Sequence, residues 1–155
     1  MDGNGIVNMK EYLKKENIIF LESSTKKEAL EELIECLVKN ASIKDKDAIK
    51  EGIFYREKLM STGIGLGIAV PHIRHESIEN ITVCVGICRK EINDYESFDG
   101  KPVKIIIMIA AGKNQHAQYL RILSYVSSKL KNDELREKIF NANDVDTIYS
   151  LMVGG

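Results

Sequence analysis

The chain contains the stretch Gly63-Ile64-Gly65-Leu66-Gly67-Ile68-Ala69-Val70-Pro71-His72, in which apolar strand-forming residues give way abruptly to proline and imidazole. Proline cannot donate to a sheet ladder and biases the residue before it towards extended geometry. The stretch therefore predicts a buried strand that stops, with His72 presented just past its end. Open α/β sheets usually carry their chemistry in such places, although a single histidine is more often structural than catalytic.

Helices and strands alternate on both sides of this stretch. Strands are expected at 18–21, 81–89 and 103–111, and helices at 25–39, 45–60, 114–130, 133–140 and 145–152. The first helix opens with a capping box, Thr25 to Glu28, ahead of apolar residues at helical spacing. The nearly continuous apolar sequence of 103–111 is typical of a strand covered on both faces. The fold class predicted is α/β, a three-layer sandwich in which a mixed β-sheet is flanked by helices on both faces.

The composition is that of an ordinary globular protein. Its 155 residues are 44% hydrophobic and 29% charged, with a net charge of −1, and this length suits one domain. Cationic residues are scattered among acidic ones, so no basic face predicts nucleic-acid binding. No apolar run approaches the ~20 residues that cross a bilayer, and no secretory signal opens the chain. Three cysteines without a paired motif favour a reducing cytoplasm.

The domain organisation predicted is simple. Residues 1–8 are rich in Gly and Asn and carry no pattern, so we interpret them as a flexible leader, with Met9 as a candidate natural start. Residues 9–155 contain neither an internal repeat nor a linker and are interpreted as a single domain.

Arg56 falls on an apolar stripe of the second expected helix. Ile49, Ile53, Arg56 and Met60 step by four, three and four, so Arg56 occupies a position where a core side chain is expected. A guanidinium cannot lose its proton, and burying it requires an anionic or well-bonded partner. The alternative is that Arg56 extends to solvent from the edge of the stripe.

His116 shows the same anomaly in the helix expected at 114–130. His116 lies in the first turn on the apolar face defined by Leu120, Leu123, Val126 or Ser127, and Leu130. A helix N-terminus favours anions and disfavours a positive imidazole, so His116 is expected to be neutral there. The alternative is a buried structural histidine.

Together, Arg56, His72 and His116 suit an imidazole nucleophile beside groups that bind an anion. An unperturbed imidazole has a pKa near 6.5, so about three quarters of it is neutral at pH 7. A phosphoryl group on the ring would add roughly −1.5 to −2 charge, which an arginine, a second histidine and a helix N-terminus could compensate. Such transfer rests on positioning and electrostatics and needs neither metal nor cofactor from the protein.

The sequence resembles the EIIA domains of the fructose/mannitol type (type 2) in the bacterial sugar phosphotransferase system, including their nitrogen-related branch. The resemblance covers nearly everything from Met9 to Met152. It is carried, in this order and spacing, by Arg56-Glu57, Ser61-Thr62-Gly63-Ile64-Gly65, Gly67-Ile68-Ala69-Val70-Pro71-His72, Phe98-Asp99-Gly100-Lys101-Pro102-Val103, Met108-Ile109-Ala110-Ala111, and His116 followed by Leu120-Arg121-Ile122-Leu123.

The resemblance implies a phosphotransferase component with a phosphohistidine intermediate. His72 would accept a phosphoryl group from the phosphocarrier HPr and pass it to a cysteine or histidine of an EIIB domain for sugar uptake. Arg56 matches the family's active-site arginine and His116 its supporting histidine, while Ser61 and Thr62 match hydroxyl residues that line the pocket. The protein would be cytoplasmic and would meet the membrane only indirectly, through an EIIC partner.

The sequence departs from the family pattern in two places. Leu66 stands where the family often has a polar residue such as Asn, and Ile73 follows the histidine where a small residue is often found. Arg74 and His75 could contact a partner or form an exposed charged turn. These departures concern the sugar branch and leave Arg56, His72 and His116 in place.

Three other functions were weighed. A dinucleotide site would need a glycine at position 68, which is Ile, and a helix after the glycines. A metal site could be built on His72, His75 and His116, with Glu76, but lacks a convincing further shell. The serious alternative is a regulatory, nitrogen-related module, in which phosphorylation of His72 controls binding to a kinase, transporter or transcription factor.

Overall fold

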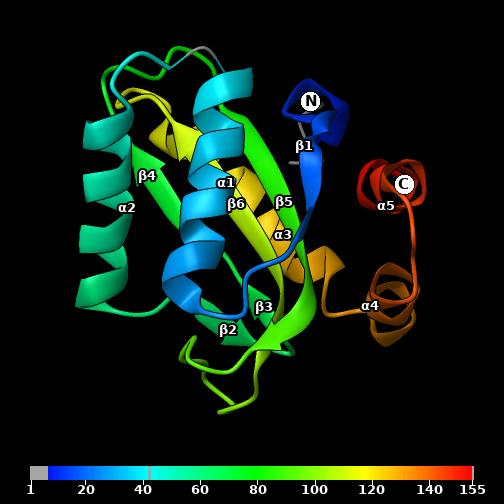
Figure 1. The fold of residues 1–155 in the computed structure, drawn as a ribbon. Helices are drawn as coiled ribbons and strands as arrows, with labels where there is room; N and C mark the ends of the chain where they lie inside the picture. The colour runs from blue at the N-terminus through cyan, green and yellow to red at the C-terminus, as the bar shows by residue number, and fades with distance from the viewer. Residues whose placement is uncertain (1–6, 42, 155) are drawn as a thin grey trace.

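A mixed β-sheet with helices on both faces organises residues 7–41 and 43–154, which are the residues that the computed structural model describes (Figure 1). In these residues the sheet has six strands: β1 (Leu13–Leu21), β2 (Gly63–Gly65), β3 (Ile68–Ala69), β4 (His72–Arg74), β5 (Thr82–Ile92) and β6 (Val103–Ala111). The helices are η1 (Met9–Glu11), α1 (Lys26–Asn40), α2 (Lys46–Leu59), α3 (His116–Lys129), α4 (Asp133–Phe140) and α5 (Val145–Val153). The three-layer α/β sandwich is confirmed.

The strands follow the order β1-β5-β6-β3-β2, and β4 also pairs with β6. β5 runs antiparallel to β6, whereas β3 and β4 both run parallel to β6. β3 and β4 therefore lie one after the other along the same side of β6. This arrangement carries the chain through Pro71 and brings His72 opposite Ile109, near the carboxyl end of β6.

β6 shows why the sheet is covered on both faces. Its side chains alternate between two hydrophobic clusters, as period-2 strand geometry requires. Ile105, Ile107 and Ile109 join the cluster that packs under α3, α4 and α5. Ile106 and Met108 join the cluster under α1 and α2, which cover the opposite face (Figure 1). The prediction of a doubly covered strand at 103–111 is confirmed.

The helices α1 and α2 each begin directly after a residue whose side chain caps them. Thr25 Oγ1 accepts from the backbone N–H of Glu28 at 3.3 Å, which is the first bond of the expected capping box. The Glu28 carboxylate accepts from the Thr25 hydroxyl at 3.0 Å and not from the backbone N–H that the full motif would use. The Asp45 side chain accepts from the backbone N–H of Ala48 and caps α2 in the same way. These caps satisfy backbone donors that the first helical turn leaves free.

The stretch from Gly63 to His72 is not the single strand that we predicted. Gly65, Leu66 and Gly67 have φ angles of 94°, 60° and 78°, and these three positive values reverse the chain between β2 and β3. Pro71 then interrupts the sheet ladder, as expected for a residue without an N–H, although its carbonyl accepts from Ile109 N at 3.0 Å. His72 lies past the end of β3, as predicted, but it is itself the first residue of β4.

The N-terminal part of the chain packs more than we expected. The strand predicted at 18–21 begins at Leu13. Residues 1–6 of the expected leader lie outside the described residues, whereas Val7 and Met9 are buried against the core. Within the described ranges, each helix is too short or too polar to cross a membrane.

Candidate active site

His72 lies half-buried where the sheet ladder is interrupted. Its Nδ1 atom is 3.2 Å from the carbonyl oxygen of Val70. A carbonyl oxygen can only accept a hydrogen bond, so Nδ1 carries the proton of the neutral ring in this contact. The other ring nitrogen, Nε2, is then unprotonated and carries a lone pair.

Arg56 reaches that second nitrogen from the last turn of α2. Its Nε donates to His72 Nε2 at 3.3 Å, and its Nη1 donates to the carbonyl of Met60 at 2.6 Å. Arginine has no acceptor, so this contact requires an unprotonated Nε2. The contacts of Val70 and Arg56 therefore favour one tautomer of His72, with the proton on Nδ1 and the lone pair on Nε2.

The apolar stripe of α2 differs from the prediction. Ile49 and Ile53 are buried, but the next inward side chain is Glu57, and Met60 is 67% exposed. Arg56 is therefore half-buried at the edge of the stripe, where its guanidinium is turned to the imidazole of His72. Arg56 thus lies at the edge of the stripe, as one interpretation expected, and its guanidinium has a hydrogen-bonding partner, as the other required.

The surroundings keep the His72 ring neutral. Burial is the largest influence and lowers the pKa of His72, and the positive charges of Arg56 and Arg74 lower it further. The Val70 carbonyl and the negative charge of Glu57 oppose this shift without overcoming it. The ring therefore offers an uncharged, nucleophilic Nε2 at neutral pH.

The helix that carries His116 is turned differently from the prediction. Its buried residues are Tyr119, Ile122 and Val126, whereas Leu120 is 47% exposed. His116 is exposed, so its expected core-facing position is wrong. The 119, 122, 126 spacing was visible in the sequence, but a tyrosine was not counted as part of an apolar face.

Tyr119 is the residue that connects α3 to the site. Its ring centroid is 5.1 Å from that of His72 and 6.1 Å from that of His116, with the rings tilted in both pairs. Such distances are typical of aromatic packing. Tyr119 therefore forms one wall beside His72, and His116 lies on the solvent side of the same helical turn.

Ser61 and Thr62 use their hydroxyl groups for contacts with other residues. Ser61 Oγ donates to the carbonyl of Glu96 at 2.6 Å and accepts from Gly63 N at 3.3 Å. Thr62 is buried, and its hydroxyl donates to the carboxylate of Glu57. In the described part of the chain, neither side chain has a hydrogen bond to His72, so their role in lining the pocket stays a prediction.

In the described part of the chain, the residues of the alternative metal and dinucleotide sites are arranged differently from what those sites require. His75 Nδ1 is 2.7 Å from the hydroxyl of Ser77, and within residues 7–41 and 43–154 no three His, Cys, Asp or Glu side chains converge as a metal site. The glycines at 63, 65 and 67 form a hairpin and open no helix.

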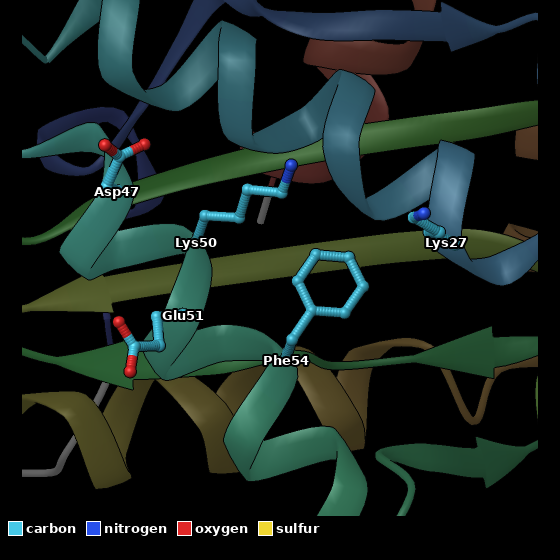
Figure 2. A pocket seen from close by; sticks show the side chains of 5 residues that line it. All are labelled: Lys27, Asp47, Lys50, Glu51 and Phe54. Carbon is cyan, nitrogen blue, oxygen red and sulfur yellow. The ribbon is translucent and has the colours of Figure 1, made fainter.

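A hollow of about 540 Å³ lies between α1 and α2 (Figure 2). It is lined by Lys27, Asp47, Lys50, Glu51 and Phe54, and His72 is not among its walls.

Comparison with known families gives this geometry its context. Residues 11–153 match the family model described as phosphoenolpyruvate-dependent sugar phosphotransferase system, EIIA 2. The chain belongs to this EIIA family. The resemblance seen in the sequence is confirmed, and the family is a phosphotransferase family.

Relatives of this EIIA chain include both fructose-specific and nitrogen regulatory proteins. The fructose-specific EIIABC component of Bacillus subtilis is 36% identical over 132 residues, which are 85% of this chain and 21% of that protein. A nitrogen regulatory protein of Bradyrhizobium diazoefficiens is 31% identical over 134 residues, 85% of either chain. The chain thus spans about a fifth of the multidomain fructose protein and most of the regulatory one.

Solved EIIA structures share the fold. The nitrogen regulatory protein IIA-Ntr from Neisseria meningitidis has a TM-score of 0.86 and 28% identity, with 93% of this chain and 98% of that chain covered. The mannitol EIIA of Escherichia coli, in complex with phosphorylated mannitol EIIB, has a TM-score of 0.77 and 26% identity, covering 92% and 99%. That mannitol protein therefore binds an EIIB domain and has a fold like that of this chain.

Proposed function

We propose that His72 accepts a phosphoryl group on Nε2 from phosphorylated HPr and passes it to an EIIB domain. Arg56 Nε first gives up its hydrogen bond to Nε2 and donates to a phosphoryl oxygen instead. The lone pair of Nε2 then attacks phosphorus, a nitrogen–phosphorus bond forms on His72, and the bond to the donor breaks with its electron pair left on the donor. The ring proton stays on Nδ1 throughout, donated to the Val70 carbonyl. The observation that carries this proposal is the contact of Arg56 with Nε2 in a neutral ring.

Arg56 would stabilise the group that arrives. A phosphoryl group brings roughly −1.5 to −2 charge, and a charge-assisted hydrogen bond from a guanidinium is about twice as strong as a neutral one. Because Arg56 Nη1 is already fixed on the carbonyl of Met60, the guanidinium does not have to be ordered at the moment of transfer. His116 would act at the rim, from the first turn of α3, where helix N–H groups favour negative charge.

Exposed apolar side chains flank the site and would receive a protein donor or acceptor. Tyr55, Leu59 and Met60 lie on the turn of α2 around Arg56 and are 63%, 64% and 67% exposed. Leu120 lies on α3, one turn after His116. Exposed apolar side chains that lie together on a surface are typical of protein–protein interaction sites.

Labelling tests the assignment of His72. The protein, mixed with enzyme I, HPr and labelled phosphoenolpyruvate, should become an acid-labile and base-stable phosphoprotein. His72→Ala should carry no label. His75→Ala is the matched control and should be labelled normally, because His75 lies three residues away and is bonded to Ser77. Label that persists on His72→Ala would refute the assignment.

The role served by this transfer is proposed to be sugar uptake, in the cytoplasm, with the membrane reached through an EIIC partner. The fructose and mannitol relatives support this role. The regulatory role is favoured by the Bradyrhizobium relative and by the Neisseria structure. Phosphotransfer against a panel of EIIB domains separates the two, because a transport component should phosphorylate one of them rapidly and a regulatory module none.

A further inference from the structure

A buried acidic side chain, that of Glu57, lies next to the active site. Glu57 follows Arg56 in α2, and its side chain is 3% exposed. One carboxylate oxygen is 3.1 Å from Lys26 Nζ and accepts from Thr62 N at 3.2 Å, while the other accepts from the Thr62 hydroxyl. Burying a charge costs much free energy unless it is paired and hydrogen-bonded, and here both conditions hold.

Tyr95 completes the cluster around Glu57. Because the Thr62 hydroxyl donates its single proton to Glu57, the contact of 2.9 Å between Thr62 and Tyr95 is donated by the Tyr95 hydroxyl. Lys26 Nζ also lies 4.4 Å from the centre of the Tyr95 ring. Burial and the charge of Glu57 raise the pKa of Tyr95, so its hydroxyl stays a donor. A fully satisfied polar network of this kind is rigid.

A line of hydrogen bonds leads from this cluster to the His72 ring. The Thr62 carbonyl accepts from Val70 N at 3.0 Å, and the Val70 carbonyl is the acceptor 3.2 Å from His72 Nδ1. On the other side of the ring, Arg56 is the chain neighbour of Glu57 in the last turn of α2. The Val70 carbonyl is therefore linked to Glu57 by hydrogen bonds through Thr62, and the Arg56 guanidinium is linked to Glu57 through the backbone of α2.

We propose that Glu57, clamped by Lys26 and Thr62, is a positioning residue that fixes the tautomer of His72 through the Val70 carbonyl and the Arg56 guanidinium. This inference rests on the proposed phosphoryl transfer for its consequence, since only an unprotonated Nε2 can attack phosphorus. A buried pair that merely held α1 against α2 would affect stability and leave the protonation of the two ring nitrogens unchanged.

NMR of labelled imidazole nitrogens tests the proposal, at a pH where the ring is neutral. The wild-type ring should carry its proton on Nδ1. In Glu57→Gln the signals should move towards a mixture of tautomers, and labelling by phosphorylated HPr should slow by about tenfold. Glu31→Gln is the matched control, because Glu31 also bridges α1 and α2, through an ion pair with Lys50 at 2.8 Å that involves no residue of the Glu57 cluster.

Thr62 supplies a second test that keeps the Lys26–Glu57 pair in place. Thr62→Val removes the hydroxyl and should shift the tautomer in the same direction, and Thr62→Ser should restore the wild-type signals. Thr62→Val decides the matter if Glu57→Gln does not fold. A folded variant of either kind with the wild-type ring signals would overturn the inference while leaving the phosphotransfer intact. Conversely, if the wild-type protein is not labelled by phosphorylated HPr, the proposed function is refuted, whereas a tautomer shift measured by NMR would still support the role of Glu57.

Discussion

Arg56 Nε lies 3.3 Å from His72 Nε2, although the two residues are 16 positions apart and belong to a helix and a strand. This contact places a permanent positive charge beside the nitrogen that carries the proposed chemistry. Burial is the main cause of the lowered pKa of His72, and the charge of Arg56 lowers it further. Arg56 therefore helps to keep the nucleophile neutral and can also bind an anion. Both the rate of phosphoryl acceptance and its dependence on pH should therefore depend on Arg56.

Arg56→Ala should slow phosphoryl acceptance by about 10- to 100-fold, because a hydrogen bond to a charged group contributes roughly 1.5–3 kcal/mol. Single-turnover labelling by phosphorylated HPr measures this rate. Arg56→Lys should recover only part of it, since lysine lacks the fixed fork of donors. Lys58→Ala, which removes an exposed cation from the same turn, is the control and should react normally. An Arg56→Ala protein that unfolds would instead indicate a structural role.

The rate of phosphoryl acceptance should depend on pH through the lowered pKa of His72. A neutral ring is the reactive form, so the rate should stay near its plateau as pH falls through 6.5, the ordinary value, and decline only below it. Arg56→Ala removes one cause of the lowering, so its profile should shift to higher pH. Single-turnover rates between about pH 5 and 8 check this. A decline centred above 6.5 in the wild type would contradict the assignment.

Local signals in the sequence were enough for the central part of the fold. The apolar run of 103–111 and the capping box at Thr25 act within a few residues, and both were found where predicted. The turn at Leu66 was missed because it depends on a distant partner: Leu66 N donates to the Asp99 carboxylate at 2.9 Å. The early start of β1 was missed because polar residues precede Ile18 and the register with β5 shifts there.

In the site, sequence reasoning found the pair Arg56 and His72 but not the groups that support it. Successive residues on a helix point about 100° apart, so an apolar pattern could not decide whether Arg56 or Glu57 faces inward. Tyr119 was missed for a related reason, since its ring is buried while the leucine beside it is exposed. Both errors concern polar or amphipathic side chains, whose burial is decided by partners far along the chain.

His116→Ala should leave stability within about 0.5 kcal/mol of the wild type, because the side chain is exposed. The variant should still accept a phosphoryl group on His72 and should pass it to an EIIB domain more slowly. Thermal unfolding and a chase of labelled protein with EIIB measure the two effects. Onward transfer at the wild-type rate would reduce His116 to a surface residue.

Leu120→Glu should weaken the encounter with phosphorylated HPr by raising KM with little change in kcat. The substitution replaces an exposed apolar contact by a negative charge that repels an anionic donor. Ser128→Glu places the same charge two turns further along α3, on an exposed position, and serves as the control. Equal KM values for the two variants would exclude Leu120 from the docking surface.

Leu66→Asn should raise the free energy of unfolding by up to about 1 kcal/mol. The backbone of Leu66 has a φ of 60°, which is strained for leucine and better tolerated by asparagine. Little burial is lost, since Leu66 is 44% exposed, and the hydrogen bond from its N–H to Asp99 is kept. For a chain of this length the midpoint of thermal unfolding should rise by about 2–4 °C per kcal/mol. Leu66→Ala is the control, because alanine keeps the Cβ atom and hence the strain. Urea unfolding of both variants measures the difference, and an asparagine variant no more stable than the alanine one would show that the hairpin turn stores no such strain.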